Sequence, residues 1–185
     1  MVLIGLPGAG KSAVAPILAA RLGRRSDDLD AAIERATGRS VPDLLRSEGE
    51  AAFRSREAAT LRALLTAGAA TLVLACGGGV VVGEASRALL ESATVIWLRV
   101  TPETAWARLG PSGAATRPLL ADRGDATEVA DDGGALSRLR ALQAAREPLY
   151  EAIADVAMTT DGRAPDDVAA LAATWLREQW AASAS

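Results

Sequence analysis

Residues 1–14 read MVLIGLPGAGKSAV, and this stretch decides the fold. A short apolar run ends at Ile4, a glycine-rich segment follows, and Lys11 and Ser12 open a helical pattern. The segment from Gly5 to Ser12 has the spacing G-x-x-x-x-G-K-S of a phosphate-binding loop between a strand and a helix. Its backbone N–H groups and the helix N-terminus attract phosphate oxygens. A glycine-rich turn that only ends a strand would need neither the lysine nor the hydroxyl.

Lys11 is the only lysine among the 20 lysine and arginine residues of the chain. In a phosphate-binding loop this lysine reaches the β- and γ-phosphates, and the hydroxyl of Ser12 is offered to Mg²⁺. The sequence therefore predicts a nucleoside triphosphate and Mg²⁺ as cofactors.

The composition limits which chemistry is possible. The chain has 185 residues, enough for one α/β domain, and its net charge of −3 gives no reason to expect a nucleic-acid partner. It contains no histidine, which excludes a Ser-His-Asp site and a histidine-ligated metal. A general base must therefore be a carboxylate. The single cysteine, Cys76, excludes an internal disulfide and fits a reducing compartment. Because the apolar runs are strand-sized, we expect a cytoplasmic protein without signal peptide or membrane span. We also expect a monomer.

Strand and helix patterns alternate along the chain, which predicts an α/β fold of three layers (αβα) around a five-stranded parallel sheet. The predicted strands are residues 1–4, 24–30 (short, polar and at or near the sheet edge), 71–75, 94–100 and 155–159. The predicted helices are residues 11–23, 31–37, 40–46, 50–66, 85–91, 102–109, 135–153 (interrupted or kinked near Pro148) and 165–180. The single domain divides into a core (1–28, 68–109, 153–185), a substrate-binding helical segment (29–67) and a lid region (110–134).

Asp28 and Asp30 end the second predicted strand, at the edge where open α/β sheets bind ligands. In an extended segment both carboxylates project from the same side. Either aspartate could instead cap the next helix. Beside a phosphate-binding loop, however, one acid can hold the water shell of Mg²⁺ while the other takes a hydroxyl proton.

Three further features point to the same crevice. Arg54 could bind a ligand carboxylate, braced by Glu57 three residues later, or it could be a solvated helix charge. Gly77, Gly78 and Gly79 follow a buried strand and allow either a close backbone approach to a ligand or a loose turn. Residues 110–134 read as a long loop carrying Arg117, which suits a closing lid over a nucleotide.

These motifs together resemble the shikimate kinase family, which has a P-loop fold like that of nucleoside monophosphate kinases. The resemblance runs through nearly the whole chain in order. It is carried by GLPGAGKS, Asp28-x-Asp30 followed by Ile33-Glu34, TGRSVPDLLRSEGEAAFRSRE, Gly77-Gly78-Gly79, Arg117-Pro118-Leu119-Leu120, and Arg146 before Pro148-Leu149-Tyr150.

The resemblance implies that the γ-phosphoryl of ATP passes to the 3-hydroxyl of shikimate. Asp30 would deprotonate that hydroxyl, Arg54 and Arg146 would hold the substrate carboxylate, and Arg117 would close from the lid. The resemblance also implies contacts with ATP from Gly8, Ala9, Gly10, Lys11, Ser12 and Ala13, and, by position only, contacts with adenine from Arg108 and Arg163. Mg²⁺ would be held by Ser12 and Asp28. The ring hydroxyls of shikimate would contact Gly77, Gly78 and Gly79.

The chain departs from the family pattern at Ala13, where a second hydroxyl is usual, at Ala15-Pro16, where Gly-Arg is more common, and in a longer lid with Asp125, Glu128, Asp131 and Asp132. Two alternatives stay open. One is a related kinase of gluconate or a cyclitol, which would not need both Arg54 and Arg146. The other is a nucleotide-binding protein with decayed catalysis.

Overall fold

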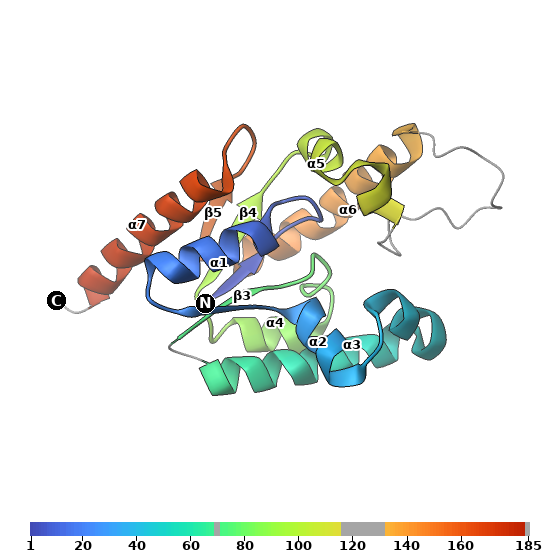
Figure 1. Cartoon of the computed structure of the whole chain (residues 1–185), viewed down its shortest axis with the longest axis horizontal. Coiled ribbons are helices and arrows are strands. Elements are labelled where there is room, and N and C mark those ends of the chain that lie inside the picture. Colours follow the sequence, from blue (N-terminus) through green and yellow to red (C-terminus); the bar gives the residue numbers. More distant parts are fainter. Residues whose placement is uncertain (69–70, 116–131, 184–185) are drawn as a thin grey trace.

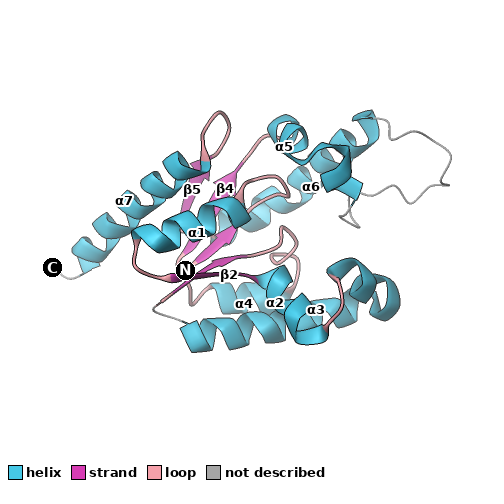
Figure 2. Ribbon diagram, in the orientation of Figure 1, coloured by secondary structure: helices cyan, strands magenta, loops and turns pink. Residues whose placement is uncertain are grey.

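The computed structural model describes residues 1–68, 71–115 and 132–183. Within these ranges five parallel strands form one sheet in the order β2-β3-β1-β4-β5, with helices on both faces (Figures 1 and 2). The predicted three-layer α/β fold is confirmed. The strands are β1 (Val2–Ile4), β2 (Arg25–Asp28), β3 (Leu72–Ala75), β4 (Val95–Arg99) and β5 (Val156–Thr159). The helices are α1 (Lys11–Arg21), α2 (Leu29–Thr37), α3 (Val41–Gly68), α4 (Glu84–Leu90), α5 (Pro102–Ala115), α6 (Asp132–Ile153) and α7 (Pro165–Ser183).

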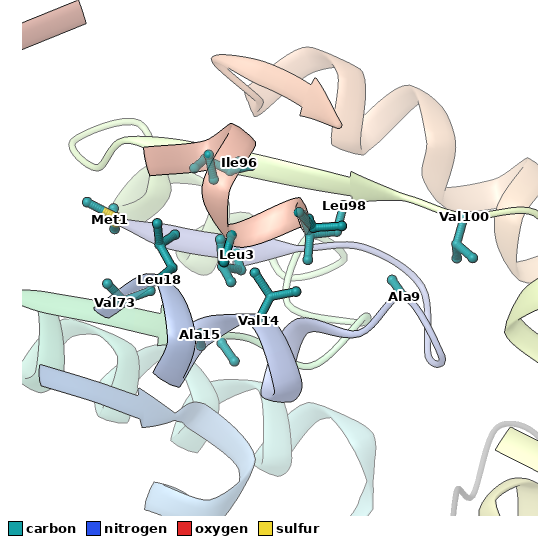
Figure 3. Packing of buried hydrophobic residues seen from close by; sticks show 14 of the residues in the cluster. Met1, Leu3, Ala9, Val14, Ala15, Leu18, Val73, Ile96, Leu98 and Val100 are labelled. Atoms are coloured by element: carbon teal, nitrogen blue, oxygen red, sulfur yellow. The ribbon is translucent and has the colours of Figure 1, made fainter. Parts of the chain in front are cut away.

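Side chains alternate between the two faces of the sheet, as strand geometry requires. Leu3 of β1 packs in the cluster that includes residues of α1 and α7, whereas its neighbours Val2 and Ile4 pack in the cluster that includes residues of α2, α3 and α4. Figure 3 shows the first cluster, in which Leu18 of α1 lies against the central strands. Both faces of the central strands are therefore buried, which explains their continuous apolar sequences.

The candidate site lies at the carboxyl ends of the parallel strands, where three functional segments begin. β1 leads into the phosphate loop, β3 into the three glycines, and β2 into α2. β2 is an edge strand, as expected, because it pairs only with β3 among the described strands. Its side chains are exposed or half-buried, so its polar sequence carries no burial cost.

Near the site, the start of one helix corrects the sequence prediction and a break inside another confirms it. α2 begins at Leu29, with Asp28 as its N-cap, so Asp30 lies in the first helical turn and not in an extended segment. The expectation that Asp28 and Asp30 share one face of a strand is therefore wrong. α3 contains a non-helical residue, Gly49, at φ 81° and ψ 168°, and this confirms the predicted break between two helices.

The helices around the predicted lid are longer than expected. α5 bends at Gly110 and continues to Ala115, and α6 begins at Asp132, so both ends of the predicted loop at 110–134 are helical. α6 passes through Pro148 as one element. Arg117, Asp125, Glu128 and Asp131 lie outside the described residues. In the described ranges, no helix has the length and apolar character needed to cross a bilayer.

Candidate active site

The phosphate loop opens onto a cavity of about 420 Å³. Lys11 is 9% exposed, and its Nζ atom donates hydrogen bonds to the carbonyl oxygens of Gly5 and Leu6, each at 2.8 Å. These bonds hold the ammonium group inside the loop at the N-terminus of α1, where anions are favoured. The residues lining the cavity are Gly8, Ala9, Gly10, Lys11, Ser12, Ala13, Val14, Arg108, Leu109, Thr160, Arg163, Pro165 and Val168.

The far wall of this cavity is tied to the phosphate loop by Arg108. Its Nη1 atom donates to the hydroxyl of Thr160 at 2.9 Å and to the carbonyl oxygen of Gly8 at 3.3 Å, and its Nη2 atom donates to the carbonyl oxygen of Thr160. Arg163, the other residue predicted near adenine, lines the same cavity. The structure thus brings both arginines to the phosphate loop.

Hydrogen bonds between Thr101 and Asp161 hold the loop that follows β5. The hydroxyl of Thr101 donates to Asp161 Oδ1 at 2.6 Å, and its backbone N–H points at the same carboxylate, 3.1 and 3.2 Å from the two oxygens. The pKa of Asp161 is lowered because these hydrogen bonds outweigh its partial burial. Sequence reasoning missed Thr101, Thr160 and Asp161. The available signal was a threonine and an aspartate, Thr160 and Asp161, in the two positions after the last strand.

Ser12 and Asp28 meet beside the phosphate loop. The Ser12 hydroxyl donates to Asp28 Oδ2 at 2.7 Å. The other carboxylate oxygen of Asp28 accepts the N–H groups of Asp30 at 3.0 Å and Ala31 at 3.3 Å. Asp28 therefore both caps α2 and presents an oxygen next to the Ser12 hydroxyl. Paired oxygen atoms of this kind suit Mg²⁺, which prefers oxygen ligands and keeps several waters.

Each of the three glycines after β3 faces a different side chain that the sequence singled out. A Cβ atom on Gly77 would lie 2.9 Å from Asp30 Oδ1. One on Gly78 would lie 3.4 Å from Arg146 Nη1, and one on Gly79 would lie 2.8 Å from Arg54 Nη2. The turn therefore has room for three functional groups because it carries no side chains of its own.

The same turn packs against the phosphate loop. A Cβ atom on Gly78 would lie 2.9 Å from the carbonyl oxygen of Gly5 and 3.1 Å from Pro7 Cδ. The structure therefore joins the predicted nucleotide residues and the predicted acceptor residues through a direct contact between two loops. Arg117, which the sequence also predicts to be a site residue, lies outside the described residues.

Arg54 is braced on the helix α3 as the sequence predicted. Glu57 Oε2 lies 2.9 Å from Arg54 Nη1, and Glu50 Oε1 lies 3.3 Å from Arg54 Nη2. Glu57 is buried, at 1% exposure, and its burial raises its pKa despite the attraction of Arg54 and Arg146. A solvated helix charge would not sit over a buried carboxylate, so Arg54 is a positioned cation.

Behind the glycines, a buried thiol and a buried phenol complete the site. Burial raises the pKa of the Cys76 thiol well above its ordinary value, and the negative charge of Asp30 adds to this effect. The thiol therefore stays neutral. The hydroxyl of Tyr150 on α6 donates to the carbonyl oxygen of Gly78 at 2.6 Å. Sequence reasoning placed Tyr150 in a motif but gave it no role.

Known proteins match this sequence over most of its length. The family model "SKI: Shikimate kinase" matches residues 7–177. The chain is 42% identical over 170 residues to a shikimate kinase of Symbiobacterium thermophilum, covering 92% of this chain and 91% of that one. It is 39% identical over 180 residues to a shikimate kinase of Streptomyces coelicolor, covering 96% of each.

A solved structure agrees with these sequence relatives. The shikimate kinase from Acinetobacter baumannii in complex with shikimate superposes with a TM-score of 0.85 at 32% identity, covering 96% of this chain and 92% of that chain. The match therefore extends over the sheet, the phosphate loop and the glycine turn together. On this evidence the chain belongs to the shikimate kinase family.

Proposed function

We propose that this protein transfers the γ-phosphoryl group of ATP to the 3-hydroxyl of shikimate, giving shikimate 3-phosphate and ADP. The observation that carries the proposal is the glycine turn, on which Asp30, Arg54 and Arg146 converge and which packs against the phosphate loop. Membership of the family and the likeness to a relative in complex with shikimate support this acceptor.

On the nucleotide side, the backbone N–H groups from Gly8 to Ala13 would cradle the phosphates of ATP. Lys11 would exchange its bonds to the carbonyl oxygens of Gly5 and Leu6 for bonds to the β- and γ-phosphates. Arg108 and Arg163 would flank the adenine base from the cavity wall. Mg²⁺, held through Ser12 and the water shell at Asp28, would neutralise charge on the transferring phosphoryl group.

On the acceptor side, the guanidinium groups of Arg54 and Arg146 would bind the carboxylate of shikimate, a geometry that arginine forks suit. The backbone of Gly77, Gly78 and Gly79 would contact the ring hydroxyls. Asp30 would orient the 3-hydroxyl and accept its proton. The hydroxyl oxygen would then form a bond to the γ-phosphorus, and the bond from that phosphorus to ADP would break.

Three further parts of the proposal come from the sequence. Arg117 would approach the phosphates from the lid once the ligands are bound, which excludes water from the reaction. The net charge of −3 favours a protein without nucleic-acid partners, and we propose a monomer. A cytoplasmic location fits the supply of ATP that the reaction needs.

The experiment is a coupled assay of ADP release at saturating Mg·ATP, run in parallel with shikimate, gluconate, myo-inositol and AMP. We expect ADP release when shikimate is the acceptor and none with the other three compounds. Release with gluconate or myo-inositol instead would identify a related small-molecule kinase. Binding of ATP without ADP release with any acceptor would indicate a protein with decayed catalysis. A Lys11→Met variant shows whether the ADP comes from this site.

A further inference from the structure

Tyr150 lies behind the glycine turn and contacts its main chain. The phenol is 1% exposed, and its hydroxyl donates to the carbonyl oxygen of Gly78 at 2.6 Å. Its ring stacks on Trp97 of β4, with the ring centroids 5.6 Å apart. A buried tyrosine held on one side by an aromatic ring and on the other by a short hydrogen bond to the main chain has little freedom to move.

The bond to Gly78 also fixes the N–H group of the next residue. The Gly78–Gly79 peptide is trans and planar, so the N–H of Gly79 points away from the carbonyl oxygen of Gly78. Because that oxygen points toward Tyr150 in the core, the Gly79 N–H points toward the opposite side of the turn. Rotation of this peptide would break the bond to Tyr150 and deprive its buried hydroxyl of this acceptor.

The backbone bonds of the turn leave this N–H available. The hydrogen bonds within the turn run from Val80 N–H to the carbonyl oxygen of Gly77 and from Val82 N–H to that of Gly79. Among the described residues, neither Gly78 nor Gly79 donates its backbone N–H to an acceptor. Two donors on a turn without side chains are suited to the hydroxyl oxygens of a small ligand.

The phenol also lies next to one of the arginines at the turn. Arg146 precedes Tyr150 by one helical turn on α6 and is buried, and its guanidinium group acts to lower the pKa of Tyr150. Burial has the larger, opposite effect and raises the pKa of Tyr150 to about 12. The hydroxyl therefore stays protonated at neutral pH and can donate to the Gly78 carbonyl oxygen.

We infer that Tyr150 is a positioning residue for the acceptor: its hydroxyl orients the Gly78–Gly79 peptide so that the Gly79 N–H faces the substrate, and the same hydroxyl, one helical turn from Arg146, helps to hold that guanidinium group in place. The inference rests on the proposed function. Tyr150 itself would touch neither ATP nor the acceptor. Its effect passes through the glycine turn and Arg146.

The first test compares the wild type with Tyr150→Phe, which keeps the ring and removes only the hydroxyl. We expect the KM for shikimate to rise about fivefold, the effect of one lost hydrogen bond, while the KM for ATP changes by less than about twofold. A matched control is Ser92→Ala, which removes a 2.9 Å bond from a hydroxyl to the Leu89 carbonyl oxygen before β4, and which should change neither KM.

A merely structural role would lower the melting temperature of Tyr150→Phe and leave the KM for shikimate unchanged. That result would overturn the inference, and so would an equal rise in both KM values. Wild-type turnover with shikimate is measured in the same assay, so that a failure of the proposed function would be seen separately.

The second test does not depend on a variant that must fold. Tyr150 is the single tyrosine of the chain, so growth on 3-fluorotyrosine labels this position alone. We expect one ¹⁹F resonance that shifts when shikimate is added and stays in place when ADP alone is added. The inference would be refuted by a resonance that ignores shikimate in a protein that turns it over, or by one that responds to ADP alone.

Discussion

Glu57 lies buried beneath Arg54, with 2.9 Å between its Oε2 atom and Arg54 Nη1. Its pKa is raised because burial disfavours the charged carboxylate more than the two nearby arginines favour it. The fold therefore keeps a carboxylate where its charge is costly. We attribute this to the orientation that it gives Arg54.

The first prediction concerns stability and pH in Glu57→Gln. The raised pKa of folded Glu57 means that its contribution to stability is complete below the unfolded value of about 4.3 and is lost as the pH rises through the folded value. Glutamine does not titrate. The melting temperature of Glu57→Gln relative to the wild type should therefore increase from about pH 4 to about pH 7. Thermal melts of both proteins across this range measure the difference, and a constant difference would contradict the raised pKa.

The same substitution should weaken the acceptor site, because Arg54 loses the partner that orients it. We expect a rise of about tenfold in the KM for shikimate and little change in the KM for ATP. Glu50→Gln is the matched control. The Glu50 side chain is 62% exposed and lies 3.3 Å from the same guanidinium, so its loss should have a much smaller effect.

A second prediction separates the two roles of Asp28. Asn caps helices about as well as Asp, so Asp28→Asn should leave the free energy of unfolding within about 1 kcal/mol of the wild type. The lost charge should nevertheless raise the Mg²⁺ concentration at half-maximal turnover roughly fivefold. Titration of the ADP assay with Mg²⁺ measures this value. An unchanged Mg²⁺ requirement would remove Asp28 from the metal site.

Asp30→Asn provides the third prediction. Loss of the proton acceptor should lower kcat by about 10²-fold or more while the KM for ATP stays nearly the same. The charge change alone is controlled by Glu91→Gln, an exposed carboxylate at the end of α4. Turnover that survives in Asp30→Asn would show that another group takes the proton.

The fourth prediction uses the space at the glycine turn. A Cβ atom in Gly79→Ala would lie 2.8 Å from Arg54 Nη2, and the end of this long side chain can shift. The free energy of unfolding should change by less than about 1 kcal/mol while the KM for shikimate rises by about tenfold. In Gly83→Ala the nearest atom to the new methyl group is Ser86 Oγ at 3.5 Å, an ordinary contact, so its KM should stay at the wild-type value.

The sequence predicts the features of this protein that depend on local spacing. The phosphate loop, the edge strand β2, the break at Gly49 and the brace between Arg54 and Glu57 all follow from residues close together in the chain. Each of these features has a local physical cause, such as glycine conformation or a helical spacing of three.

The errors arose where solvent or distant residues decide the structure. Of the interruption or kink predicted near Pro148, the interruption is wrong, because α6 continues through this residue. Pro148 and Ala144 lie exposed, so water can satisfy the carbonyl group that lacks its N–H partner. The hydrogen bonds between Thr101 and Asp161 join residues that are 60 positions apart, so no local sequence pattern predicts them.

The contact between Gly78 and the carbonyl oxygen of Gly5 has a consequence for how acceptors can change. It sets the separation of the two halves of the site by a close approach of main chain to main chain, beside the ring of Pro7. Substitutions at Arg54 or Asp30 can alter which hydroxy acid binds. They would leave the distance between the phosphate loop and the acceptor site unchanged. Redesign for a new acceptor should therefore begin with the side chains around the turn and preserve its backbone.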